Sequence, residues 1–190
     1  MKRENLVFII IALIVGVLGG YLIFSVSSKK EVAPAGGGVP VGSGTAADYR
    51  QRIETAEKIV AADPKNRQAW VQLGNDYFDT GQAQKAVNAY GKALELKPDD
   101  PNVLTDQGVM YRQLKQFDKA IANFEKAQQV SPNHLQSLFN MGMVYADDLM
   151  QPDKAMKAWS RYLELDPTSP TAQQIKALME QLKTSPKGFK

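Results

Sequence analysis

The chain of 190 residues contains no cysteine and a single histidine, His134. The lack of cysteine excludes disulfides, thiolate metal sites and a cysteine nucleophile. His134 ends the turn sequence Ser-Pro-Asn-His, where we expect a solvated turn residue and not a catalytic base. No cluster of Asp and Glu has the spacing of a metal site, and no glycine-rich phosphate loop follows a strand pattern. We therefore expect a protein without catalysis, cofactor or metal ion.

An excess of charge of one sign is also lacking. The chain has 23 Lys and Arg residues against 20 Asp and Glu residues, and its formal net charge is +3 at pH 7. Four of the basic and two of the acidic residues precede residue 46, so the longer remainder is nearly neutral. A nucleic-acid-binding protein needs a basic stripe along one face, and we therefore expect no nucleic-acid partner.

Long apolar runs are confined to one place, Leu6–Val26, where 21 consecutive residues carry no charge. As a helix this run would be about 30 Å long, which matches the hydrocarbon core of a bilayer. We predict a transmembrane helix after a short tail of residues 1–5. Lys2 and Arg3 on that tail favour a cytoplasmic N-terminus, with the rest of the chain on the far side of the membrane.

A cleaved signal peptide is the alternative interpretation of this run. Ser25, Val26 and Ser27 form an acceptable cleavage site with small residues at both ends. However, the run is longer than the apolar core of a typical signal peptide, and Lys29 and Lys30 follow it. Both features favour an uncleaved anchor.

Small residues recur on one face of the predicted membrane helix, at Ala12, Gly16 and Gly20. This spacing of four lets two membrane helices approach closely, so it predicts a homodimer or docking onto a membrane partner. The alternative is that glycine is simply frequent in membrane helices.

The remaining chain repeats itself every 34 residues. The first row of matching residues is Trp70, Leu73, Gly74, Tyr77, Ala86, Tyr90, Ala93 and Pro98. The second row is Leu104, Gln107, Gly108, Tyr111, Ala120, Phe124, Ala127 and Pro132. The third row starts with Leu138, Met141, Gly142 and Tyr145 and continues, one residue late, with Ala155, Trp159, Tyr162 and Pro167. The pattern resembles the tetratricopeptide repeat (TPR), a 34-residue unit of two helices.

The resemblance implies an all-α fold: a right-handed TPR superhelix of antiparallel helix hairpins with a terminal capping helix. The expected segments are a flexible Gly/Pro-rich linker at 27–46, a half-repeat helix at 47–66, TPR 1 at 67–100, TPR 2 at 101–134, TPR 3 at 135–169, a capping helix at 170–184 and a tail at 185–190.

Three details of this array are open to test. Asp48 is the expected N-cap of the half-repeat helix. Gly74 is expected to be small because the two helices of its hairpin cross closely, and Tyr90 is expected to fill the space between neighbouring hairpins. The extra residue of the third unit is expected to lengthen the turn at residues 148–151, and Tyr162 is expected to alter the helix crossing there.

In the TPR family the first helix of each unit lines a concave groove. The resemblance places nine residues in it: Val71, Asn75 and Phe78, then Thr105, Val109 and Arg112, then Phe139, Met143 and Ala146, with Gln68, Asn102 and Gln136 at its edge. Arg112 is the one strong base among them, whereas the family's clamp for a peptide carboxylate uses several Lys or Arg with asparagines. We therefore expect a largely apolar groove for an amphipathic helix or an extended apolar segment. Alternatively, Phe139 and Met143 pack within the superhelix.

These features predict a non-catalytic, membrane-tethered TPR scaffold that binds a protein or peptide. The anchor, linker and short capped array resemble bacterial cell-envelope assembly factors, which implies a single-pass inner-membrane protein with a periplasmic TPR domain. Within that class the architecture resembles the TPR subunits of cytochrome c-type biogenesis, which hold apocytochrome near the haem-attachment machinery. The other alternative is a self-associating structural protein of the envelope.

Overall fold

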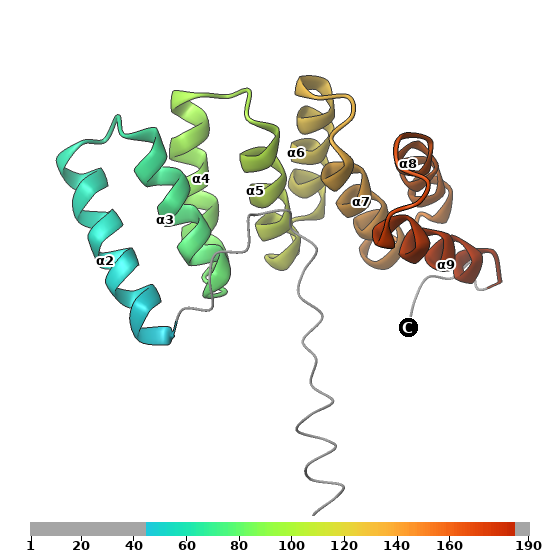
Figure 1. The fold of residues 1–190 in the computed structure, drawn as a ribbon, viewed down its shortest axis with the longest axis horizontal. Helices are drawn as coiled ribbons and strands as arrows, with labels where there is room; N and C mark the ends of the chain where they lie inside the picture. Colours follow the sequence, from blue (N-terminus) through green and yellow to red (C-terminus); the bar gives the residue numbers. More distant parts are fainter. Residues whose placement is uncertain (1–44, 185–190) are drawn as a thin grey trace, which may run out of the picture. The chain divides into compact units, whose positions relative to one another are not determined.

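A computed structural model describes residues 45–184 of the chain (Figure 1). The predicted membrane helix at Leu6–Val26, its small-residue face at Ala12, Gly16 and Gly20, and nearly all of the linker lie outside the described residues. Within 45–184, no helix is both long enough and apolar enough to cross a bilayer.

The described part is all-helical, as the repeat pattern predicts, and residues 45–184 contain no strand. The helices are α2 (Ala46–Ala62), α3 (Arg67–Asp79), α4 (Ala83–Leu96), α5 (Pro101–Gln113), α6 (Phe117–Val130), α7 (Leu135–Met143), α8 (Pro152–Leu165) and α9 (Pro170–Thr184). A π-helical turn, Val144–Asp148, extends α7. Three hairpins, α3/α4, α5/α6 and α7/α8, follow one another, with α2 before them and α9 after them (Figure 1).

The N-cap of the first helix lies three residues before the expected one. Thr45, and not Asp48, is the N-cap of α2, because its hydroxyl accepts a hydrogen bond from the Asp48 amide at 3.3 Å. The Asp48 carboxylate in turn accepts from the Thr45 amide at 2.6 Å. This reciprocal pair is a capping box, in which the acidic residue stands at the third position of the helix and not at the cap.

A glycine in the first helix of each hairpin lies against an aromatic ring of the second helix. A Cβ atom built on Gly74 would stand 2.5 Å from the Tyr90 ring, and one built on Gly108 would stand 2.5 Å from the Phe124 ring. The third hairpin pairs Gly142 with Trp159 in the same way. The glycines therefore leave room for an aromatic ring. Tyr90 fills the inside of its own hairpin and not the space between hairpins.

The extra residue of the third unit lies in a helix and not in the turn after it. Each hairpin turn has three residues, with the middle one in the left-handed region: Gly81 (φ 70°), Lys115 (φ 59°) and Met150 (φ 54°). The amide of Gln151 closes the third turn by donating to the Tyr145 carbonyl at 2.7 Å. The insertion therefore widens the last turn of helix into a π turn, which keeps the backbone hydrogen-bonded and the shape of the connection unchanged.

Tyr162 stands where the first two units have Ala93 and Ala127, both fully buried. Its ring is also buried, at 5% exposure, and it belongs to one core cluster with Ala172 and Ile175 of α9. The larger side chain thus helps to hold the capping helix, which lies across the end of the third hairpin (Figure 1).

The contact between glycine and aromatic ring leads to a matched pair of substitutions. Gly108→Ala should lower the free energy of unfolding by about 1–3 kcal/mol, because the added methyl group overlaps the Phe124 ring. Gly91→Ala should instead raise it by up to about 1 kcal/mol, because its Cβ would meet only Gln107 Nε2 at 3.5 Å and alanine favours the helix. Urea unfolding followed by circular dichroism measures both. Equal effects of the two substitutions would contradict the packing described.

Candidate functional site

The residues predicted for the groove divide into two groups by exposure. Six are partly exposed, on the first helices of the three units: Val71, Asn75, Phe78, Val109, Arg112 and Met143. Three are buried: Thr105, Phe139 and Ala146. The partly exposed apolar members rest against the core clusters beneath them, so they are anchored side chains with one free face.

Thr105 does not contribute its side chain to a groove surface. Its exposure is 0%, and its hydroxyl donates a hydrogen bond to the Pro101 carbonyl at 2.7 Å. Phe139 is also buried, at 6% exposure, in one cluster with Trp159. For Phe139 the structure therefore supports the alternative that it packs within the superhelix.

Arg112 does not offer a free positive charge. Its guanidinium pairs with Asp147 at 3.0 Å and with Asp148 at 2.5 Å. Burial raises the pKa of Asp147, and the Arg112 hydrogen bond and charge oppose that rise. The two aspartates belong to the π-helical turn, so the insertion in the third unit places the partners that neutralise this arginine.

His134 is not a solvated turn residue. It is half-buried and caps α7, with Nδ1 accepting from the Ser137 amide at 3.3 Å. The hydrogen is therefore on Nε2, which lies 3.0 Å from Asn102 Oδ1 and donates to it. Burial lowers the pKa of His134, against the opposing charge of Asp100. His134 therefore links the second unit to the third. It does so as a neutral imidazole, which donates one hydrogen bond and accepts the other.

Asp106 is an unusual residue that the sequence analysis missed. Burial raises the pKa of its carboxyl to about 7, and the charges of Asp100 and Asp79 contribute further. The 34-residue offset places Asp106 at the position of Gln72 in the preceding unit and Asn140 in the following one. The signal that could have revealed it is therefore an acid at a position where both neighbouring units have an amide.

Asn75 and Asp106 both act on the hydroxyl of Tyr90. The Asn75 side-chain oxygen accepts a hydrogen bond from the Tyr90 hydroxyl at 2.9 Å. Asp106 helps to raise the pKa of that hydroxyl, after the larger effect of burial. Asn75 is thus held in place by the core, which fixes its orientation on the surface.

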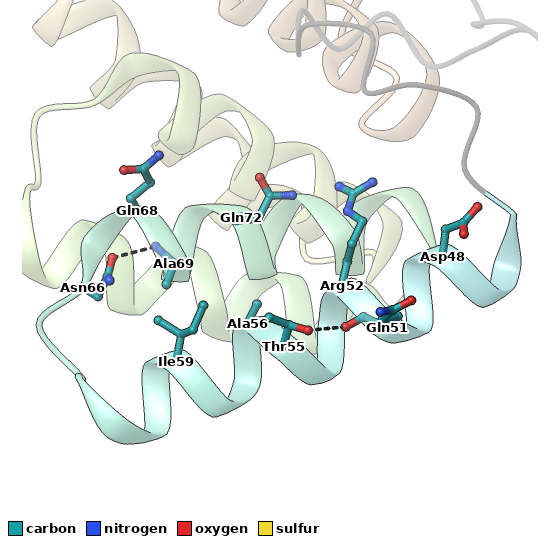
Figure 2. Close-up of a pocket in the computed structure, with 10 residues that line it drawn as sticks. All are labelled: Asp48, Gln51, Arg52, Thr55, Ala56, Ile59, Asn66, Gln68, Ala69 and Gln72. Atoms are coloured by element: carbon teal, nitrogen blue, oxygen red, sulfur yellow. Dashed lines mark hydrogen bonds between the residues drawn. The ribbon is translucent and has the colours of Figure 1, made fainter.

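Two open grooves mark the described surface near the start of the array. The first, of about 800 Å³, lies between α2 and α3 and is lined by Asp48, Gln51, Arg52, Thr55, Ala56, Ile59, Asn66, Gln68, Ala69 and Gln72 (Figure 2). The second, of about 740 Å³, is lined mainly by residues of α2, α3 and α4, among them Val60, Trp70 and Asn88. Of the predicted groove-facing residues, only Gln68, an expected edge residue, lines either of them.

Residues 45–184 contain no group of three or more His, Cys, Asp or Glu side chains that could hold a metal ion.

Three family models match consecutive parts of the array. A TPR repeat model matches residues 74–109, and tetratricopeptide repeat models match residues 101–134 and 136–169. Together they follow the hairpins that the structure shows. The chain is a tetratricopeptide repeat protein. Its array serves protein interaction, the property that TPR units share, while the identity of a partner depends on the surface of each array.

Curated relatives share the repeats over a limited part of their length. The small glutamine-rich tetratricopeptide repeat-containing protein 2 of Mycosarcoma maydis is 27% identical over 114 residues, which are 59% of this chain and 32% of the relative. A probable UDP-N-acetylglucosamine–peptide N-acetylglucosaminyltransferase, SPINDLY of Hordeum vulgare, is 30% identical over 59% of this chain but only 12% of its own length. The chain thus spans a third or less of these two relatives.

Solved structures show the same fold. The crystal structure of MamA superposes with a TM-score of 0.67 at 23% identity, over 73% of this chain and 80% of MamA. The first TPR of Spaghetti (RPAP3) bound to the HSP90 peptide SRMEEVD superposes with a TM-score of 0.58 at 24% identity, over 65% of this chain and 97% of that one. At these identities the likeness establishes the fold alone.

The raised pKa of Asp106 predicts a stability that depends on pH. A carboxyl whose folded pKa exceeds its unfolded value stabilises the fold below the unfolded pKa of about 4, and this contribution is lost as the pH rises through about 7. Asp106→Asn should therefore gain stability relative to the unsubstituted chain, by about 2 kcal/mol more at pH 8.5 than at pH 5. Urea unfolding at the two pH values measures the difference.

Glu54→Gln is the control for this prediction, because it removes an exposed carboxyl from the middle of α2. Its effect should change little between the two pH values. A gain for Asp106→Asn that is the same at pH 5 and pH 8.5 would contradict the raised pKa of Asp106.

Proposed function

We propose that this protein is a non-catalytic, membrane-tethered scaffold whose TPR array binds a protein or peptide segment along the first helices of its units. The observation that carries the proposal is the set of anchored, half-exposed apolar residues Val71, Phe78, Val109 and Met143 on three successive first helices. Asn75, fixed by Tyr90, adds a polar group among them.

The chemistry of this surface favours an apolar segment over an acidic one. The RPAP3 array is bound to SRMEEVD, a peptide that ends in two glutamates, a valine and an aspartate. Here the one strong base of the predicted groove, Arg112, already pairs with Asp147 and Asp148. An amphipathic helix or an extended apolar strand of a partner fits the remaining side chains better.

The location follows from the sequence and not from the described residues. We propose a single-pass protein of the bacterial inner membrane, anchored by Leu6–Val26, with the TPR array in the periplasm and a role in cell-envelope assembly. An apocytochrome-holding subunit in cytochrome c maturation is the more specific alternative. A self-associating structural protein, aided by Ala12, Gly16 and Gly20, is the other.

Site-specific photo-crosslinking in living cells tests the proposal. Probes at Val109 and at Phe78 should capture the same partner, because both lie on first helices of neighbouring units. A probe at Val130, which is 38% exposed at the end of α6, should not capture it. Capture of an apocytochrome or a haem-lyase component would support the maturation alternative, and capture of this protein itself would support self-association.

A charged substitution on the same surface tests the proposal by a measured binding affinity. Val109→Asp should leave the fold intact and weaken binding of the captured partner by about tenfold or more, because it places a carboxylate in an apolar contact. Val130→Asp, with the same change on an exposed site, should weaken it less than about twofold. Equal affinities for Val109→Asp and the unsubstituted chain would remove this surface from the proposed function.

A further inference from the structure

The groove between α2 and α3 lies where the array is missing one helix. The 34-residue offset aligns α2 with α4, which is the second helix of the first complete hairpin. In that hairpin α3 covers one face of α4, so that Ala86, Tyr90 and Ala93 are 0–1% exposed. The residues of α2 at the same positions are Arg52, Ala56 and Ile59, and all three line the groove (Figure 2).

Exposure shows that this face of α2 is only partly covered, since Ala56 at its centre is 5% exposed. Ile59 is 41% exposed, whereas Ala93, its counterpart one repeat later, is fully buried. Large apolar side chains on the face of a helix that packs against another helix are normally buried, so Ile59 stands on an interface without its partner helix.

The sequence one repeat before α3 does not favour such a helix. The positions one repeat before α3 are residues 33–45, which read Ala-Pro-Ala-Gly-Gly-Gly-Val-Pro-Val-Gly-Ser-Gly-Thr. Two prolines and five glycines oppose helix formation. Pro40 stands at the position that Gly74 and Gly108 occupy in the first helices of the next two units. The sequence therefore does not predict a first helix at these positions.

The charges around the groove favour a helix with a basic C-terminal end. The Arg52 guanidinium pairs with the fully buried Asp76 of α3, so its positive charge is compensated. Asp48, at the N-terminal end of α2, is an exposed carboxylate, and hydrogen bonds from Thr45 hold its pKa below the usual value. Asp79 lies at the same end, because the Tyr49 hydroxyl donates to it at 3.3 Å. This end of the groove is therefore negative.

The first helix of a hairpin runs antiparallel to the second, so the C-terminal end of a docked helix would lie at Asp48. Basic residues in the last turn of a helix complement both its own dipole and these carboxylates. We propose that the α2/α3 groove binds an amphipathic helix of a partner protein, antiparallel to α2, with apolar residues on Ala56 and Ile59 and a basic last turn facing Asp48. The helix completes the half-repeat in trans, at a site separate from Val109 and independent of the function proposed above.

Two peptides used as probes on the full chain test this site. One has the sequence of α3, Arg67–Asp79, which is the array's own first helix and has an acidic last turn. The other carries the substitutions Asp76→Asn and Asp79→Lys, which together make that end basic. Both are held helical by a bridge on the outward face and labelled for fluorescence anisotropy, because short helices are marginal in water.

The basic peptide should bind with a micromolar dissociation constant, and the acidic peptide at least tenfold more weakly. Ile59→Asp in the protein should weaken the basic peptide at least tenfold. Leu96→Asp is the matched control, since Leu96 is also 41% exposed, and it should change the affinity less than twofold. Asp48→Asn should remove most of the preference between the peptides, while Val109→Asp should leave both affinities unchanged.

Several results would overturn the proposal. They are the absence of binding by the basic peptide, equal losses for Ile59→Asp and Leu96→Asp, or equal affinities for the two peptides. A cysteine at position 59, unique in this cysteine-free chain, provides a further test by crosslinking. Crosslinks from it to residues 1–44 would assign the groove to the chain's own N-terminal segment. Crosslinked dimers would assign it to a second copy.

Discussion

The contact between a glycine and an aromatic ring sets the geometry of each hairpin. Gly74, Gly108 and Gly142 have no side chain, so Tyr90, Phe124 and Trp159 can lie flat against the first helix of the hairpin. The rings are almost fully buried, and the alanines one helical turn on either side of the first two let the helices stay close. Because the same contact recurs at nearly the same offset, the hairpins stack in a regular row.

The third hairpin shows how the array absorbs a departure from this rule. One extra residue enters between Tyr145 and Gln151, and the π-helical turn takes it up without changing the left-handed residue that closes the connection. That widened turn carries Asp147 and Asp148 to Arg112 of the preceding unit. The extra residue of the third unit therefore changes the charge on the surface of the second unit, because it places Asp147 and Asp148 beside Arg112.

The two ends of the array differ in how they are covered. At the C-terminal end α9 places Ala172, Ile175 and Leu182 over the ring of Tyr162, so the last hairpin is closed. At the N-terminal end α2 presents Ile59 and a groove of about 800 Å³ to its surroundings. A repeat array has only nearest-neighbour contacts, so an end without a cap leaves one helix face without a partner. This asymmetry is the basis of the docking site proposed at α2.

Within residues 45–184 the sequence alone predicted three helix hairpins between a half-repeat helix and a capping helix, because the 34-residue spacing of glycine, aromatic and proline residues marks each unit locally. It predicted a close contact at Gly74 but placed Tyr90 between hairpins and not inside its own. Only the tertiary structure decided the state of individual side chains: that Thr105 is buried, that Arg112 is paired, that His134 caps α7 and that Asp106 has a raised pKa. These properties depend on residues about 30 positions away and on the depth of burial, which a periodic pattern does not encode. The sequence also predicted α2 as a half-repeat, whereas only the structure showed the exposed Ile59 and the groove between α2 and α3.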